Sequence, residues 1–350
     1  MPPPPPPPLQ NIALIGANGH LGPAILTALL SAPASPHKFN VTVLSRASSA
    51  SNPTYPSSVR TTLISPDPSV DELVRCLRGC DALIVAVSGA LADLQMRLAD
   101  AAARAGVRRF VPADFGSCDS RSARAAALVP LYGAKGRVRA HLRTLAAAAA
   151  AAGEKEGEGE GEDDTGFSWT SLVCGHFFDY GLRTGLLGFE MGGAKKAKVF
   201  DGGHGRWSAT TLEAVGRAVV GVLRHEAETR NRMLYIQSFC TTQNEVLASL
   251  EKATATTTAT AKTTTTTRGA WRVEEVESGP YIEKLKAEME RDPGNNAQAA
   301  EEELVGVLGL LEADWSGKED FANELLGLGG EDLDEVVQKV VATTAASESV

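Results

Sequence analysis

The sequence predicts an α/β protein with a doubly wound, mostly parallel Rossmann-type sheet and a smaller C-terminal lobe. Three observations support this. Short apolar runs alternate with amphipathic stretches from residue 10 onward, a glycine-rich turn follows the first run, and the runs are continuously apolar. Continuous apolar strands are typical of parallel sheets that helices cover on both faces. Right-handed crossovers between such strands then produce a doubly wound sheet.

Apolar runs predict the strands, and the amphipathic stretches between them predict helices. The strands of the first half are predicted at residues 12–15, 41–44, 61–64, 82–87 and 109–112. The helices of this half are predicted at 21–31, 69–78 and 91–105, and Gly106 is placed to end the last of them as a C-cap. The later chain is predicted to add strands at 167–173 and 231–238, and helices at 212–223, 281–291, 298–311 and 331–341.

Composition divides the chain into a tail, two ordered parts and two insertions. Seven prolines at residues 2–8 predict a disordered tail over residues 1–9, with docking to an SH3-like partner as the alternative. Residues 10–175 are predicted to form the Rossmann domain, and residues 176–350 a smaller lobe with segments that return to the sheet. A flexible acidic stretch at 153–164 and a Thr/Ala stretch at 253–267 are predicted to be surface insertions, because neither offers apolar area to bury.

Charge and cysteine content argue against several classes of protein. The chain has a formal net charge of -9 and no basic stripe, which argues against nucleic-acid binding. No apolar run reaches the ~18 residues that a membrane span needs. The five cysteines include no C-x-x-C pair, and the histidines are not at metal-ligand spacing, so neither a disulfide framework nor a metal site is predicted. With no signal or transit pattern at the N-terminus, we expect a cytoplasmic protein. The oligomeric state is not predicted.

The glycine-rich turn predicts a dinucleotide-binding site. Its spacing is Gly16-x-x-Gly19-x-x-Gly22, between a predicted strand and a predicted helix. Gly16 allows a sharp turn, Gly19 lets a pyrophosphate approach the backbone, and Gly22 lets the helix pack closely on the strand. The alternative is a turn that serves packing alone. The predicted cofactor-binding residues of this turn are Gly16, Ala17, Asn18, Gly19, His20, Leu21 and Gly22.

The end of the second predicted strand favours NADP(H) over NAD(H). In NAD-binding folds an acidic residue near this point accepts a hydrogen bond from the ribose 2′-hydroxyl. This chain has Ser45 and Arg46 there. A guanidinium can bind a 2′-phosphate through paired, charge-assisted hydrogen bonds, whereas an acid would repel it. The alternative is an ordinary surface arginine at a strand end.

A tyrosine-based mechanism is disfavoured by spacing. Short-chain dehydrogenases use Tyr-x-x-x-Lys, whereas Tyr132 and Lys135 are only three residues apart. Gly133 and Gly136 also weaken the helix that would place the two side chains on one face.

Several longer motifs resemble one family. The turn at 16–22 and the run at 105–116, Ala-Gly-Val-Arg-Arg-Phe-Val-Pro-Ala-Asp-Phe-Gly, resemble the NmrA-like and isoflavone-reductase-like branch of atypical short-chain dehydrogenases. The segment 135–139 resembles the family's Lys-x-x-(Ile/Val)-Arg element. Residues 169–182, and Trp207-Ser-Ala-Thr before a helix, resemble the fungal members. The resemblance covers roughly residues 11–250.

The resemblance implies a catalytic role for Lys135. The ammonium group would hydrogen-bond the nicotinamide ribose and donate or relay a proton to the substrate as hydride arrives. A proton donor works best with a pKa near the working pH, and burial lowers the pKa of a lysine toward that range. The alternative is a surface lysine on a basic helix. The chain departs from the plant enzymes at Tyr55, where they carry a second basic residue, so Ser45 or Arg60 is expected to assist Arg46.

Two further groups of residues are expected at the carboxyl edge of the sheet, where ligands sit in open α/β folds. The first is expected to contact the cofactor and comprises Ser88, Gly89, Pro112, Asp114 and Phe115, with a helix or turn cap as the alternative role for Asp114. The second is expected to form an apolar substrate pocket with one polar tip and comprises Phe115, His176, Phe177, Phe178 and Tyr180. His176 is considered as a catalytic acid or base, with a packed core histidine as the alternative.

These expectations describe an NADPH-dependent reductase of a small apolar or aromatic carbonyl, quinone or activated alkene. The main alternative is a non-catalytic NADP(H)-binding sensor that regulates a partner, as in part of the NmrA branch. Such a sensor needs the glycine turn but neither Lys135 nor a closed apolar pocket. A third hypothesis is an oligomeric scaffold that uses the Pro and Thr/Ala tracts.

Overall fold

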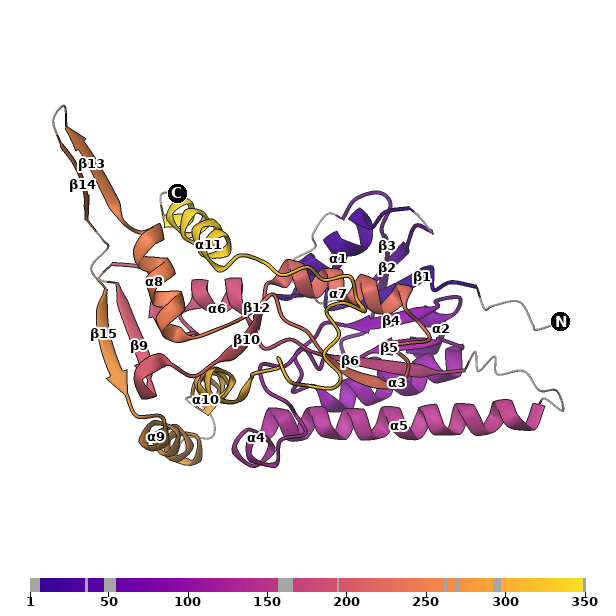
Figure 1. Cartoon of the computed structure of the whole chain (residues 1–350). Coiled ribbons are helices and arrows are strands. Elements are labelled where there is room, and N and C mark those ends of the chain that lie inside the picture. The colour runs from indigo at the N-terminus through magenta and orange to yellow at the C-terminus, as the bar shows by residue number, and fades with distance from the viewer. Residues whose placement is uncertain are drawn as a thin grey trace.

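A parallel sheet of seven strands forms the centre of the protein (Figure 1). The strands are β1 (Asn11–Ile15), β2 (Asn40–Arg46), β3 (Arg60–Ile64), β4 (Ala82–Val85), β5 (Arg109–Val111), β6 (Ser168–Val173) and β11 (Arg232–Tyr235). Their order in space is β11-β6-β5-β4-β1-β2-β3, and every pair is parallel. The order reverses beside β1, so the crevice at the carboxyl ends of β1 and β4 is the topological switch point of the sheet.

The computed structural model describes residues 7–34, 37–46, 55–156, 166–193, 195–260, 263–267, 271–291 and 297–348. The fold class predicted from the sequence is confirmed.

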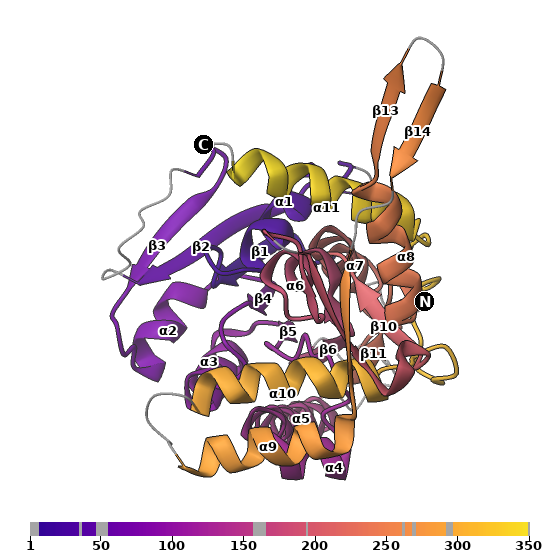
Figure 2. The same ribbon diagram turned by 90° about the vertical axis from the view of Figure 1, so that its left-hand side faces the viewer.

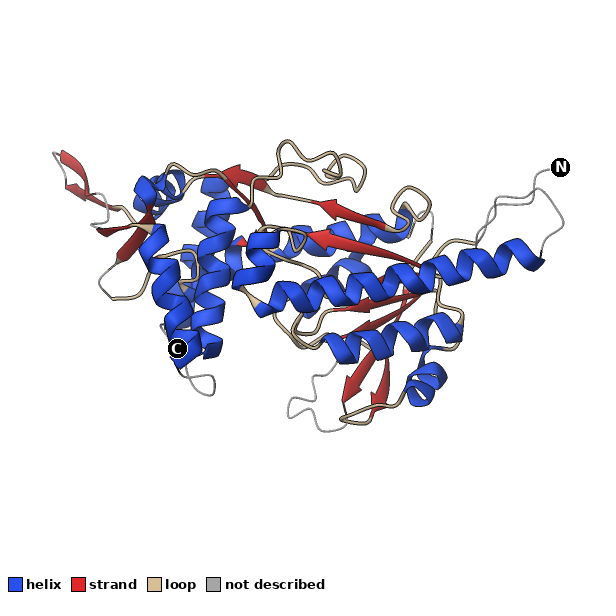
Figure 3. Ribbon diagram, turned by 90° about the horizontal axis from the view of Figure 1, so that it is seen from below, coloured by secondary structure: helices blue, strands red, loops and turns tan. Residues whose placement is uncertain are grey.

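Helices cover both faces of the sheet because both faces of its strands are apolar. In β1, Ile12 and Leu14 belong to one buried cluster, whereas Ala13 and Ile15 belong to another on the opposite face. The first face packs against α1 (Gly22–Ser31) and α7 (Leu212–Arg224), and the second against α2 (Val70–Leu77), α3 (Ala92–Ala105) and α5 (Pro130–Glu156). Helix α5 extends well beyond the strands (Figure 3). The short helix α4 (Ala123–Leu128) precedes it.

The later chain builds a lobe beside the carboxyl edge of the sheet, around a third apolar cluster. Two small sheets lie there, ordered β12-β10-β7 and β15-β9-β8. Their strands are β7 (His176–Phe177), β8 (Phe189–Glu190), β9 (Lys196–Phe200), β10 (Trp207–Thr210), β12 (Phe239–Thr241) and β15 (Arg272–Val276). The helices of the lobe are α6 (Phe178–Thr184), the short 3-10 helix η1 (Asp201–Gly203), α8 (Gln243–Ala253), α9 (Ser278–Arg291), α10 (Ala297–Glu312) and α11 (Leu333–Glu348). Figure 2 shows α10 and α9 side by side, running across the molecule.

All seven predicted strands of the central sheet and all seven predicted helices occur at the expected places. The strands predicted at 82–87 and 231–238 end earlier, at Val85 and Tyr235. The missed elements are mostly short strands of the lobe and helices α4, α6 and α8. Helix α5 was expected around Lys135, but without bounds. Helix α8 did have a sequence signal: Thr242 and Glu245 form a reciprocal capping box.

The predicted tail and insertions are only partly described. Residues 1–6 and 157–165 lie outside the described part of the chain. At the end of the tail, Leu9 is fully buried in the core, and Arg108 donates a hydrogen bond of 2.6 Å to the Pro7 carbonyl. The tail predicted over residues 1–9 therefore includes residues that pack against the domain. Within the Thr/Ala stretch, β13 (Thr256–Thr260) and β14 (Thr263–Thr267) pair as an antiparallel ribbon that projects from the lobe (Figure 1).

No helix in the described part of the chain is both long and apolar enough to cross a bilayer.

Candidate active site

A cleft of about 1020 Å³ lies over the switch point of the sheet. The glycine turn forms its floor, and the loops that follow β2, β4 and β5 form its walls. Most of the predicted cofactor residues line it: Gly16, Ala17, Asn18, Gly19, His20, Leu21, Ser45, Arg46, Ser88, Gly89, Phe115 and Lys135. Gly22, Pro112 and Asp114 are not among its lining residues. We call this cavity the cofactor cleft.

Backbone geometry explains the outer two glycines of the turn. Gly16 has a φ of +88°, and a Cβ there would lie 2.4 Å from the Ala86 carbonyl oxygen. A Cβ on Gly22 would lie 2.1 Å from the Gly16 carbonyl oxygen. Gly19 donates its N–H to the same oxygen at 3.0 Å, which closes the turn. No side chain caps the following helix α1. Pro23 has no N–H and the Ala24 N–H bonds the Leu21 carbonyl, which leaves the Gly22 N–H at the start of the helix to receive an anion.

The far end of the cofactor cleft carries Ser45 and Arg46 at the end of β2. Arg46 is exposed to solvent. Asp67 also lines this end of the cleft, and its carboxylate forms an ion pair of 2.5 Å with Arg97. The expectation that Arg60 assists Arg46 is wrong. Arg60 pairs in register with Thr42 near the start of β2, so it lies toward the opposite edge of the sheet.

Tyr55 lines the same cleft, and its hydroxyl donates a hydrogen bond to Asn18 Oδ1 at 2.5 Å. The position that holds a second basic residue in the plant enzymes therefore braces the glycine turn in this chain. Burial raises the pKa of the Tyr55 hydroxyl, although the bond to Asn18 opposes that change.

Lys135 reaches the cofactor cleft from α5 and is only 6% exposed. Its side chain fits between two glycines: a Cβ on Gly89 would lie 2.8 Å from the lysine Cε, and a Cβ on Gly116 would lie 3.1 Å from its Nζ. Burial lowers the pKa of Lys135, and the Asp114 carboxylate partly opposes this. Within the described part of the chain, no hydrogen bond to Nζ is found. The ammonium group is therefore available to a ligand in the cleft.

Asp114 has a different position from the one expected. It is 3% exposed, and its Oδ2 accepts a 2.6 Å hydrogen bond from Arg139 Nη1, while Ser120 Oγ donates to its Oδ1 at 3.3 Å. It caps no helix. Its carboxylate is held in a buried ion pair with Arg139, which lies one helical turn from Lys135 on α5.

Tyr132 is also buried, and its hydroxyl shares a hydrogen bond of 2.9 Å with Ser117 Oγ. The Lys135 Nζ lies 5.9 Å from the centroid of the tyrosine ring. Tyr132 is not among the residues that line either cleft described here. This placement agrees with the spacing argument against a tyrosine-based mechanism.

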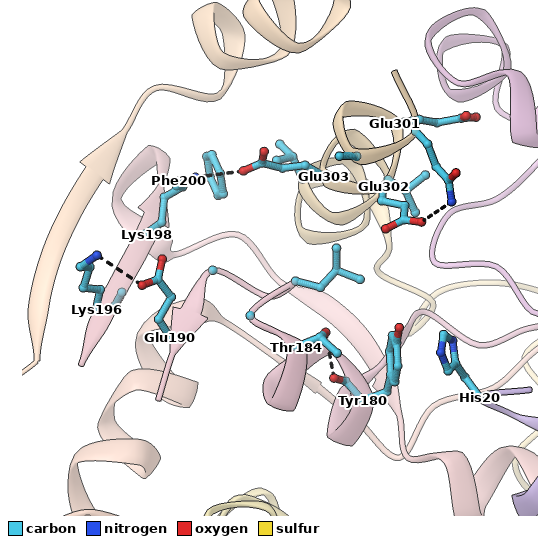
Figure 4. Close-up of a pocket in the computed structure, with 18 of the residues that line it drawn as sticks. His20, Tyr180, Thr184, Glu190, Lys196, Lys198, Phe200, Glu301, Glu302 and Glu303 are labelled. Atoms are coloured by element: carbon cyan, nitrogen blue, oxygen red, sulfur yellow. Dashed lines mark hydrogen bonds and ion pairs between the residues drawn. The ribbon is translucent and has the colours of Figure 1, made fainter. Parts of the chain in front are cut away.

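A second cleft of about 1000 Å³ adjoins the first and opens into the lobe (Figure 4). The two clefts share five lining residues: His20, Ser88, Leu131, Gln298 and Glu302. Where the clefts meet, the ring centroids of His20 and Tyr180 lie 4.5 Å apart. We call this cavity the lobe cleft.

Of the predicted substrate-pocket residues, Tyr180 lines the lobe cleft, while Phe115 and Phe177 line the cofactor cleft. Phe178 and His176 line neither. Phe178 is fully buried against Trp207 and Phe239.

His176 is a packed core histidine. Its Nε2–H donates to the Gly306 carbonyl at 2.9 Å, and its ring meets Trp207 edge-on at 5.6 Å. A Cβ on Gly309 would lie 2.3 Å from the same Nε2, so α10 accommodates the imidazole at a glycine. Burial lowers the pKa of His176 to about 4, which keeps the ring neutral at neutral pH. The imidazole fastens β7 to α10.

This histidine should make the protein sensitive to acid. In the unfolded chain His176 binds a proton below its ordinary pKa of 6.5, whereas in the folded chain it does so only below about 4. Between these values the unfolded state holds the extra proton, so the free energy of unfolding should fall by about 1.4 kcal/mol per pH unit of acidification. Below the lower value this loss should stop.

The measurement is urea unfolding across this pH range, with His176→Gln as the comparison. Glutamine keeps an N–H donor for the Gly306 carbonyl but does not titrate. The wild type should lose stability more steeply than the variant over this window. Equal slopes would show that His176 does not titrate as inferred.

The wall of the lobe cleft is more charged than expected. Lys196 Nζ lies 3.4 Å from Glu190 Oε2, and Lys198 Nζ lies 2.9 Å from Glu303 Oε1 (Figure 4). Lys198 Nζ also donates a hydrogen bond of 2.5 Å to the Tyr281 hydroxyl. The expectation of an apolar pocket with one polar tip is therefore wrong for this end. The sequence held no signal for this wall, because Lys198 and Glu303 are 105 residues apart.

The fold and the site together define a protein with a Rossmann-type sheet and a large cleft at its topological switch point. The model of the NmrA-like family matches residues 8–151. The relative named Oxidoreductase aprR, from Aspergillus flavus, is 30% identical over 340 residues, which cover 94% of this chain and 98% of the relative. The chain belongs to the NmrA-like family, as the resemblance of its motifs indicated, and it is an oxidoreductase.

Solved structures show the same fold over almost the whole length. AtPrR2 with NADP+ and (+)pinoresinol superposes with a TM-score of 0.68 at 19% identity and covers 95% of this chain and 98% of that one. Isoflavone reductase superposes with a TM-score of 0.62 at 18% identity and covers 94% of this chain and 99% of that one.

Proposed function

We propose that this chain is an NADPH-dependent reductase that transfers hydride to a small apolar or aromatic carbonyl, quinone or activated alkene. The observation that carries the proposal is the buried ammonium group of Lys135 at the edge of the cofactor cleft, which bonds no partner among the residues that the structure describes. A structural lysine would be expected to bond a neighbouring carboxylate. Here the nearest buried carboxylate, Asp114, is taken by Arg139.

The residues of the cofactor cleft fit an extended NADP(H) molecule. The N–H groups around the glycine turn and α1 suit the pyrophosphate. Ser45 and Arg46 suit a 2′-phosphate, since a guanidinium binds phosphate oxygens in pairs. Ser88, Gly89, Phe115 and Lys135 then lie toward the nicotinamide end. The structural neighbour AtPrR2, which was solved with NADP+, supports this choice of cofactor.

Bound NADPH would supply the hydride, and the protein would orient the substrate and provide a proton. The Lys135 ammonium would hold the ribose and give its proton to the atom that gains negative charge as the hydride arrives. Its lowered pKa suits this role, because a donor is most effective near the working pH. Phe115 and Phe177 offer apolar surface beside the reacting bond.

The lobe cleft indicates which shape and polarity the substrate would have. Its inner part offers Leu131, Tyr180 and Val305 to an apolar or aromatic body, whereas its outer wall carries the Lys196 and Lys198 ion pairs. We propose that residues 10–175 form the cofactor domain, which β11 and α7 complete, and that the later lobe supplies this substrate surface.

The test is NADPH oxidation against a panel of quinones, aldehydes and enones. Each compound is paired with an analogue that carries a hydroxyl or carboxylate distant from the reducible bond. The proposal expects turnover of at least one compound and none with NADH at equal concentration. A protein that binds NADPH in calorimetry but reduces nothing on the panel would support the sensor hypothesis instead.

A further inference from the structure

A buried ion pair lies beside Lys135. Lys135 and Arg139 are one turn apart on α5, and both are nearly inaccessible to solvent. Arg139 Nη1 bonds both Asp114 Oδ2 and Ser120 Oγ, each at 2.6 Å. Within the described part of the chain, no ion pair joins Lys135 to Asp114. The carboxylate thus has two cations near it and bonds only one.

We infer that Arg139 is a positioning residue, which occupies the Asp114 carboxylate and so leaves the Lys135 ammonium free to act in the cofactor cleft. This inference rests on the proposed role of Lys135. Without Arg139, the Asp114 carboxylate would still have the buried Lys135 ammonium group nearby. A lysine that pairs with it would hold its proton more tightly and would turn away from the cofactor.

Other groups around Lys135 do not compete for this role. Cys118, on the loop after β5, and Cys174, after β6, are buried thiols whose pKa values burial raises, so both are neutral. The Tyr132 hydroxyl, on the same helix, is neutral for the same reason. Glu302 of α10 lines the cleft from the opposite side and is exposed. Among the residues that the structure describes, the buried charges that face Lys135 are therefore Asp114 and Arg139.

The two partners should influence Lys135 in opposite directions. A carboxylate stabilises the charged form of a lysine, and a neighbouring guanidinium disfavours it. Loss of Arg139 removes the repulsion and releases the carboxylate, so Lys135 should keep its proton to higher pH. Loss of the Asp114 charge should have the reverse effect. If Arg139 and Asp114 served packing alone, neither loss would change the pKa of Lys135.

The experiment is an NMR titration of isotope-labelled lysine ε-carbons in the full chain, with and without NADP+, and the Lys135 signal is assigned from a Lys135→Met sample. In Arg139→Gln the midpoint should rise by about one pH unit, the scale for a close charge. In Asp114→Asn it should fall. Arg139→Lys keeps a cation at the site and should stay near the wild type.

Two further variants keep the result interpretable. Arg137→Gln makes the same charge change at an exposed site on α5 and should leave the midpoint unchanged. The double variant Asp114→Asn/Arg139→Gln replaces the ion pair by two amides and avoids an unpaired buried charge. Its midpoint should fall, because Asp114 influences Lys135 more than Arg139 does.

A midpoint in Arg139→Gln equal to or below the wild-type value overturns the inference. If that variant does not fold, a double variant with the wild-type midpoint overturns it equally. These readouts do not depend on turnover. If Lys135→Ala retains full activity while the midpoints shift as expected, the proposed catalytic role of Lys135 fails and the electrostatic arrangement stands. If the wild-type protein reduces nothing on the panel, the proposed function itself fails, whatever the midpoints do.

Discussion

Replacing Lys135 with alanine is expected to lower kcat by about 10²–10⁴-fold, the usual contribution of general acid–base catalysis. The substitution removes the ammonium group that reaches the cofactor cleft between Gly89 and Gly116. It should also weaken NADPH binding by about 1–3 kcal/mol, because the ribose would lose a charge-assisted hydrogen bond. The measurement is steady-state NADPH oxidation with the best substrate of the panel, together with calorimetry of cofactor binding.

Two controls separate proton donation from charge and packing. Lys135→Arg keeps the positive charge but should not restore kcat, since a guanidinium stays protonated and cannot relay a proton. Arg137→Ala removes an exposed cation from the same helix and should leave kcat unchanged. If Lys135→Ala turns over at the wild-type rate, Lys135 has no part in the mechanism.

Replacing Arg46 with alanine is expected to weaken NADPH binding by roughly 1.5–3 kcal/mol, the range for hydrogen bonds to charged groups. This corresponds to a loss of affinity of about 10- to 150-fold. NADH binding should change little, because NADH has no 2′-phosphate for Arg46 to hold. Calorimetric titration of both cofactors into both proteins measures the difference directly.

Arg60 provides the matched control for this experiment. It lies on the adjacent strand β3 but near the opposite edge of the sheet, in register with Thr42. Arg60→Ala makes the same change in net charge and should leave both affinities as they are. Equal affinity of the wild-type protein for NADPH and NADH would show that Arg46 does not select the cofactor.

Much of the sheet could be predicted from the sequence because its determinants are local. Most of the strands are rich in apolar residues, as β4 is throughout, and covering helices such as α7 repeat apolar residues at helical spacing. The glycine turn could be recognised from its local spacing. Gly22 is required by the nearby Gly16 and Ala17, whereas Gly16 is required by Ala86, which follows the neighbouring strand β4. Arg46 and Lys135 could be singled out because each follows or lies within a recognisable motif.

The short strands of the lobe were missed for the same reason. Strands such as β7 and β8 have two residues each, too few to display any period. They exist because distant segments pair with them: β10 lies between β7 and β12, and β9 lies between β8 and β15.

The sequence by itself therefore determined the Rossmann sheet, the glycine turn and the candidate residues Arg46 and Lys135. The tertiary structure alone decided which neighbours surround them. It placed His176 in the core against Gly306, paired Asp114 with Arg139 instead of the cofactor, and assembled the charged wall of the lobe cleft from Lys198 and Glu303. Local periodicity specifies which face of an element is apolar. It does not specify which polar side chains meet across the chain, because those contacts depend on how the finished elements pack.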